Sequence, residues 1–268
     1  MLKLVACDLD GTIIDEKGVC DKSVIDAIEF LKEKDILFVI CSGRPVESVL
    51  PLTKRWGLEG CFDYIVGSGG GEVKNMSTGK MVTTYTLEED VIMDIINTYE
   101  PLGLVPTHYD GATLYVERKT EQTEKVVSRV NVECYETDIR SMIKGPQIKH
   151  MMIIEPSEME RVEKYAREHP DERYVSFKTA NDLFEFNHRL LAKDIGLQII
   201  SSQTGIDASE MMAFGDTTND IEMLKYVGYG IAMENGTSDA KAVAYDVCGD
   251  IHQNGFANYV REFLEEED

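Results

Sequence analysis

The stretch VACDLDGTIID, residues 5–15, joins a run typical of a buried strand to three carboxylates within eight residues. Carboxylates that lie side by side in a protein interior are unfavourable unless a cation or a proton holds them. Residues two apart in a strand point to the same face, so Asp8 and Asp10 can both face one bound phosphate at the end of this strand. One carboxylate could then act as a nucleophile and the other could carry a proton, while Gly11 lets backbone N–H groups approach the ligand.

DLDGT also admits two simpler interpretations. Asp10-Gly11 is ordinary turn chemistry after a strand, so the segment could be a turn only. A calcium loop fits poorly, because Gly11 occupies the fourth place of such a loop instead of the sixth and Thr12 replaces a ligand. The catalytic interpretation explains more of the stretch than either.

Apolar runs that end at polar residues recur along both ends of the chain, at residues 2–7, 36–41, 62–66, 211–214 and 229–233. Helical patterns follow several of them, over 21–34, 45–57, 219–228 and 257–267. Strands that alternate with helices predict a parallel sheet covered on both faces, a Rossmann-like α/β core. Ligands bind such sheets beyond the carboxyl ends of the strands, where Asp8, Asp10, Ser42 and Asp216 fall.

The middle of the chain has a different pattern. Residues 88–100 and 157–169 predict helices, residues 148–155 predict a strand, and two strand pairs are predicted, 104–111 with 112–118 and 173–179 with 183–188. The first pair would turn at Asp110-Gly111 and the second at Asn181-Asp182. We therefore predict a core from residues 1–80 and 186–268, with an α+β cap domain inserted at 81–185.

Three further segments could complete the carboxylate cluster. GDTTND, residues 215–220, places Asp216 at a strand end, where it could supply the further oxygen ligand that Mg²⁺ needs, although the segment would also suit a helix cap. CSGRP, residues 41–45, offers an anion the Ser42 hydroxyl and free N–H groups at Gly43, but a plain turn is the simpler interpretation. Lys193 opens a predicted helix. GSGGGE, residues 67–72, lacks the signature of a phosphate loop and is interpreted as a chain reversal.

Composition narrows the class of partner. A net charge of −22 disfavours nucleic acid and acidic lipid, and no apolar run approaches the length that spans a membrane. The six cysteines are scattered without zinc-like spacing, which fits a reducing compartment. We expect a cytoplasmic protein that binds a small molecule, and no obligate protein partner is evident.

Taken together, DLDGT, SGRP, Lys193 and GDTTND resemble, in order and approximate spacing, the four motifs of the haloacid dehalogenase-like phosphatases. The long insertion resembles the type IIB cap of the Cof-like hydrolases. The resemblance spans nearly the whole chain. It implies a Rossmann-like core, a mobile cap, Mg²⁺ as cofactor, and hydrolysis of small phosphate monoesters such as sugar phosphates.

The resemblance also implies a role for individual residues. Asp8 matches the nucleophile and Asp10 the acid and base. Phosphate-binding positions match Ser42, Gly43, Lys193, Asn219 and Gly11. The Mg²⁺ ligands match Asp8, Asp216 and the backbone carbonyl of Asp10. Asp220 and Thr12 match positions that support these ligands without binding the ion directly.

The chain departs from the family pattern at Ser68, Asn254 and Asp194, where the family commonly has Asn, Asp and Gly; these departures bear on contacts to the leaving group. Two alternatives to the phosphatase stay open. One is a phosphomutase of the same superfamily, and the other is a non-catalytic protein that binds a phosphorylated metabolite. The sequence does not identify the substrate or the oligomeric state.

Overall fold

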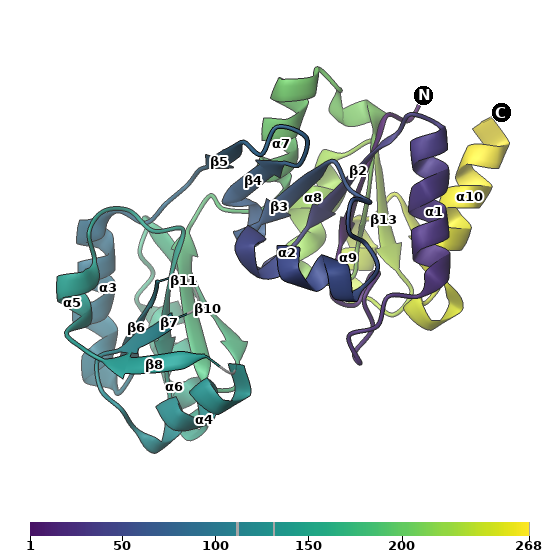
Figure 1. The fold of residues 1–268 in the computed structure, drawn as a ribbon. Helices are drawn as coiled ribbons and strands as arrows, with labels where there is room; N and C mark the ends of the chain where they lie inside the picture. Colours follow the sequence, from purple (N-terminus) through teal and green to yellow (C-terminus); the bar gives the residue numbers. More distant parts are fainter. Residues whose placement is uncertain (111–112, 131, 268) are drawn as a thin grey trace. The chain divides into compact units, whose positions relative to one another are not determined.

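The computed structural model describes residues 1–110, 113–130 and 132–267, and the chain divides into two compact units (Figure 1). Unit 1 comprises Met1–Thr84 and Leu191–Asp268, and unit 2 comprises Tyr85–Leu190. The predicted insertion at 81–185 is therefore shifted at both ends. Residues 81–83 form a strand of the unit 1 sheet, and the last strand of unit 2 runs to His188.

Unit 1 is built on an eight-stranded sheet in the order β14-β13-β12-β1-β2-β3-β4-β5. The pairs among its first six strands are all parallel, whereas β4 and β5 pair antiparallel. The strands are β1 (Leu4–Asp8), β2 (Leu37–Cys41), β3 (Tyr64–Gly67), β4 (Glu72–Asn75), β5 (Met81–Thr83), β12 (Met211–Gly215), β13 (Tyr229–Met233) and β14 (Asp246–Cys248). The predicted α/β class with a parallel sheet is confirmed. The β4–β5 hairpin was not predicted, because its residues are largely polar and only half buried.

Helices cover both faces of this sheet. One face packs against α1 (Lys22–Glu33), α2 (Val46–Arg55) and α10 (Gly255–Glu267), and the other against α7 (Lys193–Thr204), α8 (Ile221–Tyr226) and α9 (Ser238–Val243). Figure 1 shows α1 and α10 side by side. The N-terminal cap of α1 is Asp21, whose carboxylate accepts a hydrogen bond from the Ser23 N–H.

The shared strand direction brings distant residues to one edge of the sheet. β1 lies between β12 and β2, with Cys7 opposite Phe214 and Asp8 opposite Cys41. Ser42 and Asp216 are the residues that directly follow β2 and β12. Their side chains therefore emerge at the same sheet edge as Asp8, as the strand pattern predicts.

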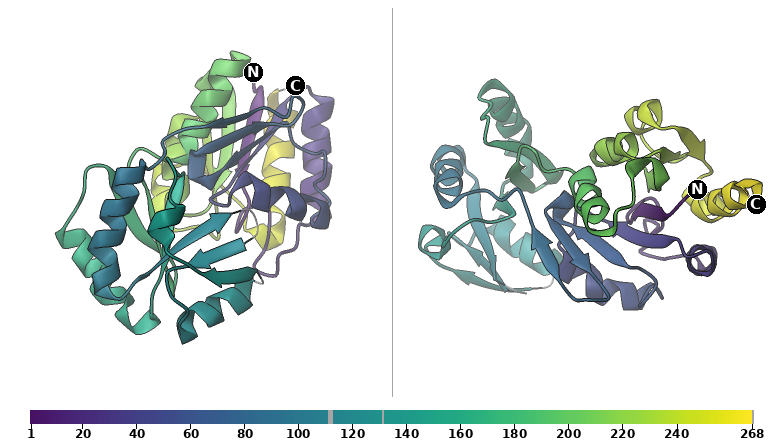
Figure 2. Two further views of the ribbon diagram at one scale, coloured as in Figure 1. Left: turned by 60° about the vertical axis from the view of Figure 1, so that its left-hand side comes forward. Right: turned by 90° about the horizontal axis from the view of Figure 1, so that it is seen from above.

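Unit 2 has a six-stranded sheet in the order β10-β11-β9-β6-β7-β8, and Figure 2 gives two further views of it. Its strands are β6 (Val105–Asp110), β7 (Thr113–Val116), β8 (Glu133–Glu136), β9 (Lys149–Ile153), β10 (Tyr174–Ala180) and β11 (Leu183–His188). Its helices are α3 (Glu89–Tyr99), α4 (Glu121–Val130), α5 (Ile139–Met142) and α6 (Met159–Glu168). Residues of α3, α5 and α6 share one apolar cluster with the sheet, and α4 shares another.

The expected elements of unit 2 are all present, namely α3, α6, β9 and two strand pairs. The turn at Asn181-Asp182 lies between β10 and β11 as predicted. The turn predicted at Asp110-Gly111 reaches outside the described residues. The segment that holds α4, β8 and α5 was not predicted, because it is rich in charged side chains and its apolar runs are short.

His150 on β9 makes acid sensitivity an expected property of unit 2. Its ring is 1% exposed, and neither ring nitrogen has a hydrogen-bond partner among the described residues. Burial lowers its pKa from 6.5 to about 3, and nearby His108 acts in the same direction. Below pH 6.5 the unfolded chain therefore binds a proton at His150 that the folded chain does not bind. The contribution of His150 to the unfolding free energy is full above pH 6.5 and is lost as the pH falls toward 3.

We expect His150→Leu to flatten this pH dependence. At pH 5 the neutral histidine should account for about 2 kcal/mol of lost unfolding free energy relative to pH 8. Denaturant unfolding of wild type and variant at both pH values measures the difference. His252→Gln, at an exposed position in unit 1, serves as the control. Equal pH slopes for wild type and His150→Leu would show that His150 does not stay neutral.

Candidate active site

The edge of the unit 1 sheet carries a buried network centred on Lys193, the first residue of α7. The Lys193 side chain is 1% exposed, and its Nζ donates to Asp8 Oδ1 at 2.5 Å and to Asp220 Oδ1 at 2.6 Å. Such a buried cation is stable only beside anions. The network thus joins residues that are 185 and 27 positions apart in the sequence.

Protonation in this network is governed by burial and by the neighbouring charges. Burial raises the pKa of the Asp8 carboxyl, the Lys193 ammonium opposes the shift, and the Asp220 and Asp216 carboxylates add to it. Burial lowers the pKa of Lys193, but the Asp8 and Asp220 carboxylates outweigh it, so that the pKa of Lys193 is raised. The raised pKa of Lys193 keeps the proton on its ammonium, whereas the net effect on Asp8 is a pKa above its ordinary value. A metal ion on the same carboxylates would lower the pKa of Asp8 and favour its ionised form.

Asp220 organises the loop after β12. Its Oδ2 accepts hydrogen bonds from the backbone N–H groups of Asp216 (2.9 Å) and Thr217 (3.0 Å), while its Oδ1 accepts from Lys193. The side chain has no exposed surface. The helix-cap interpretation of GDTTND is therefore realised as well, because Thr217 caps the short helix Thr218–Asp220 and Asp220 completes the capping box. Asp220 also fixes the backbone of Asp216.

Asp216 is 7% exposed, and its Oδ1 accepts a hydrogen bond from the Thr12 hydroxyl at 3.2 Å. Burial raises its pKa to about 6, with Asp220 adding to the shift. Gly11 has a φ of +90°, and a Cβ there would lie 2.4 Å from Asp216 Oδ2. The DLDGT turn and the GDTTND loop thus approach each other so closely that only glycine fits at residue 11.

The acidic residues suit a hard divalent cation. Asp8, Asp216 and Asp220 each offer a carboxylate oxygen, and these atoms lie within 4.8 Å of one another. Mg²⁺ prefers oxygen ligands and usually keeps several waters, so two carboxylates suffice to hold it. Because both oxygens of Asp220 already accept hydrogen bonds, Asp8 and Asp216 are the better candidates for direct ligands.

Asp10 was expected to face the ligand together with Asp8, but its side chain lies outside the acidic cluster. The residue lies beyond the end of β1, and its side chain is 52% exposed. Its carboxylate instead accepts two hydrogen bonds from the Arg44 guanidinium, from Nε at 2.9 Å and from Nη2 at 2.8 Å. The alternation of side chains ends with the strand, which is why the spacing of two residues does not carry over. The backbone carbonyl of Asp10 stays a predicted ligand.

Arg44 is the residue that motif reasoning missed, although SGRP contains it. An arginine two residues after a strand-end serine, in a strongly acidic chain, was the available signal. A bidentate guanidinium fixes a carboxylate in orientation as well as position. Arg44 therefore holds Asp10 at the rim of the buried network.

The remaining predicted phosphate-binding residues divide into two environments. Ser42 is 1% exposed, and its Oγ accepts a hydrogen bond from the Arg44 N–H at 3.1 Å, while Gly43 is exposed. Asn219 is also exposed, and its Oδ1 accepts from the Thr217 hydroxyl at 2.6 Å. Ser42 and Gly43 lie at the end of β2 as expected, whereas Asn219 makes no contact with the Lys193 network in the hydrogen bonds of the described residues.

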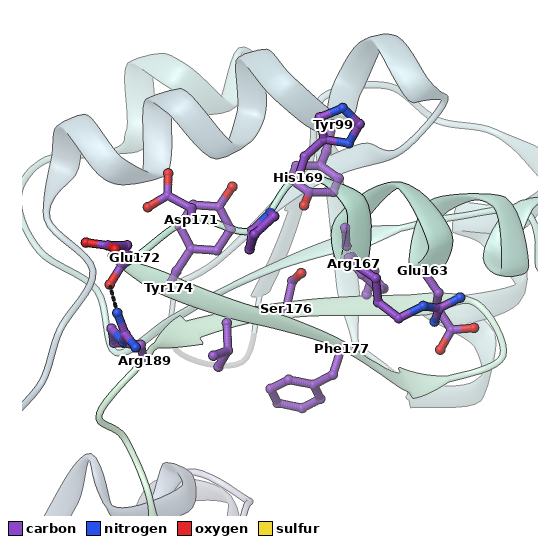
Figure 3. Close-up of a pocket in the computed structure, with 14 residues that line it drawn as sticks. Tyr99, Glu163, Arg167, His169, Asp171, Glu172, Tyr174, Ser176, Phe177 and Arg189 are labelled. Atoms are coloured by element: carbon purple, nitrogen blue, oxygen red, sulfur yellow. Dashed lines mark hydrogen bonds between the residues drawn. The ribbon is translucent and has the colours of Figure 1, made fainter.

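A cavity of about 600 Å³ lies in unit 2 beside α6 and β10 (Figure 3). Arg189 and Glu172 lie together at one end, where Arg189 donates to the Glu172 carbonyl, and Arg167 lies at the other. None of the sequence-predicted site residues lines it. The candidate chemistry therefore belongs to the carboxylate network of unit 1.

Comparison with known proteins agrees with these features. The family model described as haloacid dehalogenase-like hydrolase matches residues 5–260. The 5-amino-6-(5-phospho-D-ribitylamino)uracil phosphatase of Escherichia coli (strain K12) is 27% identical over 271 residues, which cover 99% of this chain and 97% of the relative.

Solved structures have the same fold at low sequence identity. A protein of Thermotoga maritima superposes with a TM-score of 0.85 at 22% identity, covering 98% of this chain and 97% of the other. A sugar phosphatase described as subclass IIB of the same superfamily gives a TM-score of 0.79 at 21% identity, with 97% and 98% of the chains covered.

None of the helices in the described ranges is long and apolar enough to cross a membrane.

Proposed function

This chain belongs to the haloacid dehalogenase-like hydrolases, and from that premise we propose that it is a Mg²⁺-dependent phosphatase that hydrolyses small phosphate monoesters. The observation that carries the proposal is the buried ammonium of Lys193 between Asp8 and Asp220, with Asp216 beside them. A nucleophilic carboxylate, a fixed cation and an acidic metal site within one cluster are the parts that phosphoryl transfer requires.

In the proposed first step, an Asp8 carboxylate oxygen attacks phosphorus and the bond from phosphorus to the leaving oxygen breaks. Asp10 gives its proton to that oxygen, so the alcohol leaves neutral. Asp10 then accepts a proton from water as the water oxygen attacks phosphorus, which releases inorganic phosphate and regenerates Asp8. Lys193 stabilises the charge on the transferring group. Because both Asp10 oxygens accept from Arg44 in this structure, Asp10 would have to release one of these hydrogen bonds in order to carry a proton.

Asp8 and Asp216 would hold the cation, and Thr12 and Asp220 would orient Asp216 from behind. When bound, Mg²⁺ would neutralise charge on the phosphoryl oxygens. The phosphate oxygens would also accept hydrogen bonds from the Ser42 hydroxyl and from backbone N–H groups near Gly43 and Gly11.

The leaving group is proposed to be a sugar or a related polyol. The support is the likeness to the subclass IIB sugar phosphatase and to the relative that acts on a phosphoribitylamino compound. Unit 2 is proposed to select the leaving group, as the inserted domain that the resemblance implies. A screen of phosphorylated metabolites would identify the substrate.

Phosphate release from p-nitrophenyl phosphate tests the proposal and its rivals. We expect turnover with Mg²⁺, turnover at background after dialysis against EDTA, and recovery when Mg²⁺ returns. Asp216→Asn should raise the Mg²⁺ concentration needed for half-maximal rate, because a neutral amide is a weaker ligand than a carboxylate. Turnover that survives removal of metal would refute the metal assignment.

The same assay separates the alternatives. A metabolite-binding protein would bind phosphorylated compounds but release no phosphate at any Mg²⁺ concentration. A phosphomutase would convert one sugar phosphate to an isomer while free phosphate stayed low. Asp10, an acid and base that mere binding does not need, favours the phosphatase over the binding protein.

A further inference from the structure

The segment Gly67–Glu72, called here the glycine segment, connects β3 to β4 and contacts two parts of the candidate site. Chain reversal alone would need neither its close contacts nor its buried polar groups. Ser68 is 5% exposed and adopts a φ of +50°, a left-handed conformation that a serine adopts only when the surroundings impose it.

On one side the glycine segment holds the loop after β2. The Ser68 N–H donates to the Arg44 carbonyl at 2.8 Å, and the Gly69 N–H donates to the Ser42 carbonyl at 3.0 Å. Glu72 closes the arrangement, since its Oε2 accepts from the Val46 N–H and from the Ser68 hydroxyl, both at 2.9 Å. The backbone that presents Ser42 and Arg44 is therefore fixed at both ends by one neighbouring segment.

On the other side the same segment contacts the start of α7. Gly70 has a φ of +110°, and a Cβ there would lie 2.0 Å from the Ala192 carbonyl oxygen. That oxygen accepts the hydrogen bond from the Ile195 N–H that begins α7, so it cannot move without disturbing the first turn. Lys193 is the next residue, and its Nζ contacts Asp8.

We propose that the glycine segment is a positioning element of the catalytic reaction, which holds the backbones that carry Arg44, the partner of Asp10, and Lys193, the partner of Asp8. Glu72 and Gly70 are its two essential residues, and neither is among the groups assigned above to the metal, the phosphate or the proton transfer. The inference rests on the proposed function for its kinetic consequence. The mechanical part, that the segment fixes both backbones, is independent of any activity.

Gly70→Ala tests the contact with α7, and Gly79→Ala is the matched control. Both glycines have positive φ, but a Cβ at Gly79 meets nothing within 4 Å. Both variants therefore strain the backbone, Gly70→Ala (φ +110°) more than Gly79→Ala (φ +71°), and only Gly70→Ala also displaces Ala192. We expect Gly70→Ala to lower kcat on p-nitrophenyl phosphate by about 100-fold, because small misplacements of catalytic groups have effects of that size. The KM and the kcat of Gly79→Ala should stay near those of the wild type.

Glu72→Ala and Glu72→Gln test the other contact. The alanine variant removes the acceptor of the Val46 N–H, whereas the glutamine carbonyl can still accept it. We expect the alanine variant to lose kcat and the glutamine variant to recover most of it. A merely structural role would lower the melting temperature of both without this difference in kcat.

Amide hydrogen exchange provides a readout without turnover. Gly70→Ala should speed exchange at the start of α7, and Glu72→Ala should speed exchange over residues 42–46, with Gly79→Ala like the wild type. If the wild type releases no phosphate but the two variants show these exchange effects, the phosphatase proposal is overturned. The fixing of both backbones by the glycine segment is then retained. Exchange and kcat that are the same for Gly70→Ala and Gly79→Ala would overturn the inference itself.

Discussion

Asp8→Asn is expected to abolish phosphate release, lowering kcat to background by a factor on the order of 10⁴ or more. An amide oxygen is a far poorer nucleophile toward phosphorus than a carboxylate, and it cannot form the aspartyl phosphate. The fold should survive, because Asp220 still neutralises Lys193 after the substitution. Initial rates with p-nitrophenyl phosphate and Mg²⁺ measure the effect, and circular dichroism checks the fold.

The control for this variant is Asp26→Asn on the surface of α1, where the carboxylate pairs with the exposed Lys22 among the described residues. It should keep wild-type turnover, because exposed pairs contribute little. Should Asp8→Asn retain a rate near that of the wild type while folded, the nucleophile would have to be another group. Acid quenching during turnover would then find no phosphoenzyme at Asp8.

Lys193→Met is expected to have the second largest effect, on stability and on turnover together. The substitution leaves Asp8 and Asp220 buried without their cation, and breaking a buried ion pair destabilises a fold by about 3–5 kcal/mol. Denaturant unfolding in EDTA measures this loss. Added Mg²⁺ should recover part of it, because a bound cation replaces some of the missing positive charge.

Two comparisons make this experiment specific. Lys225→Met removes an exposed lysine paired with Glu222, so its unfolding free energy should hardly change. The double variant Lys193→Met/Asp220→Asn removes one of the stranded charges and should be more stable than Lys193→Met alone. If Lys193→Met in EDTA were as stable as the wild type, Lys193 would not neutralise the carboxylates.

The sheet and the positions of the carboxylates could be predicted from sequence because their signals are local. Short apolar runs alternate with helical patterns, and the chemistry-bearing residues Asp8, Ser42 and Asp216 directly end or follow such runs. Parallel pairing then brings strand ends to one edge whatever the intervening segments contain. The convergence of Asp8 with Asp216 was therefore predictable, and the structure confirms it.

The division of labour among the polar groups could not be predicted in the same way. Asp10 lies outside the buried cluster and pairs with Arg44, and Asp220 binds both Lys193 and the Asp216 backbone. Glu72 on β4 accepts a hydrogen bond from the Val46 N–H at the start of α2. Each of these bonds depends on where loops end within a few ångströms, which no hydrophobic period specifies.

The class of fold and the residues that can do chemistry are specified locally, because apolar periodicity and motif spacing are properties of neighbouring residues. Three features are visible only in the folded chain: Asp8 is buried against Lys193, Asp10 points outward, and Gly70 has no room for a side chain. Those outcomes follow from burial, charge pairing and close approach between segments far apart in the chain, and these interactions exist only once the chain has folded.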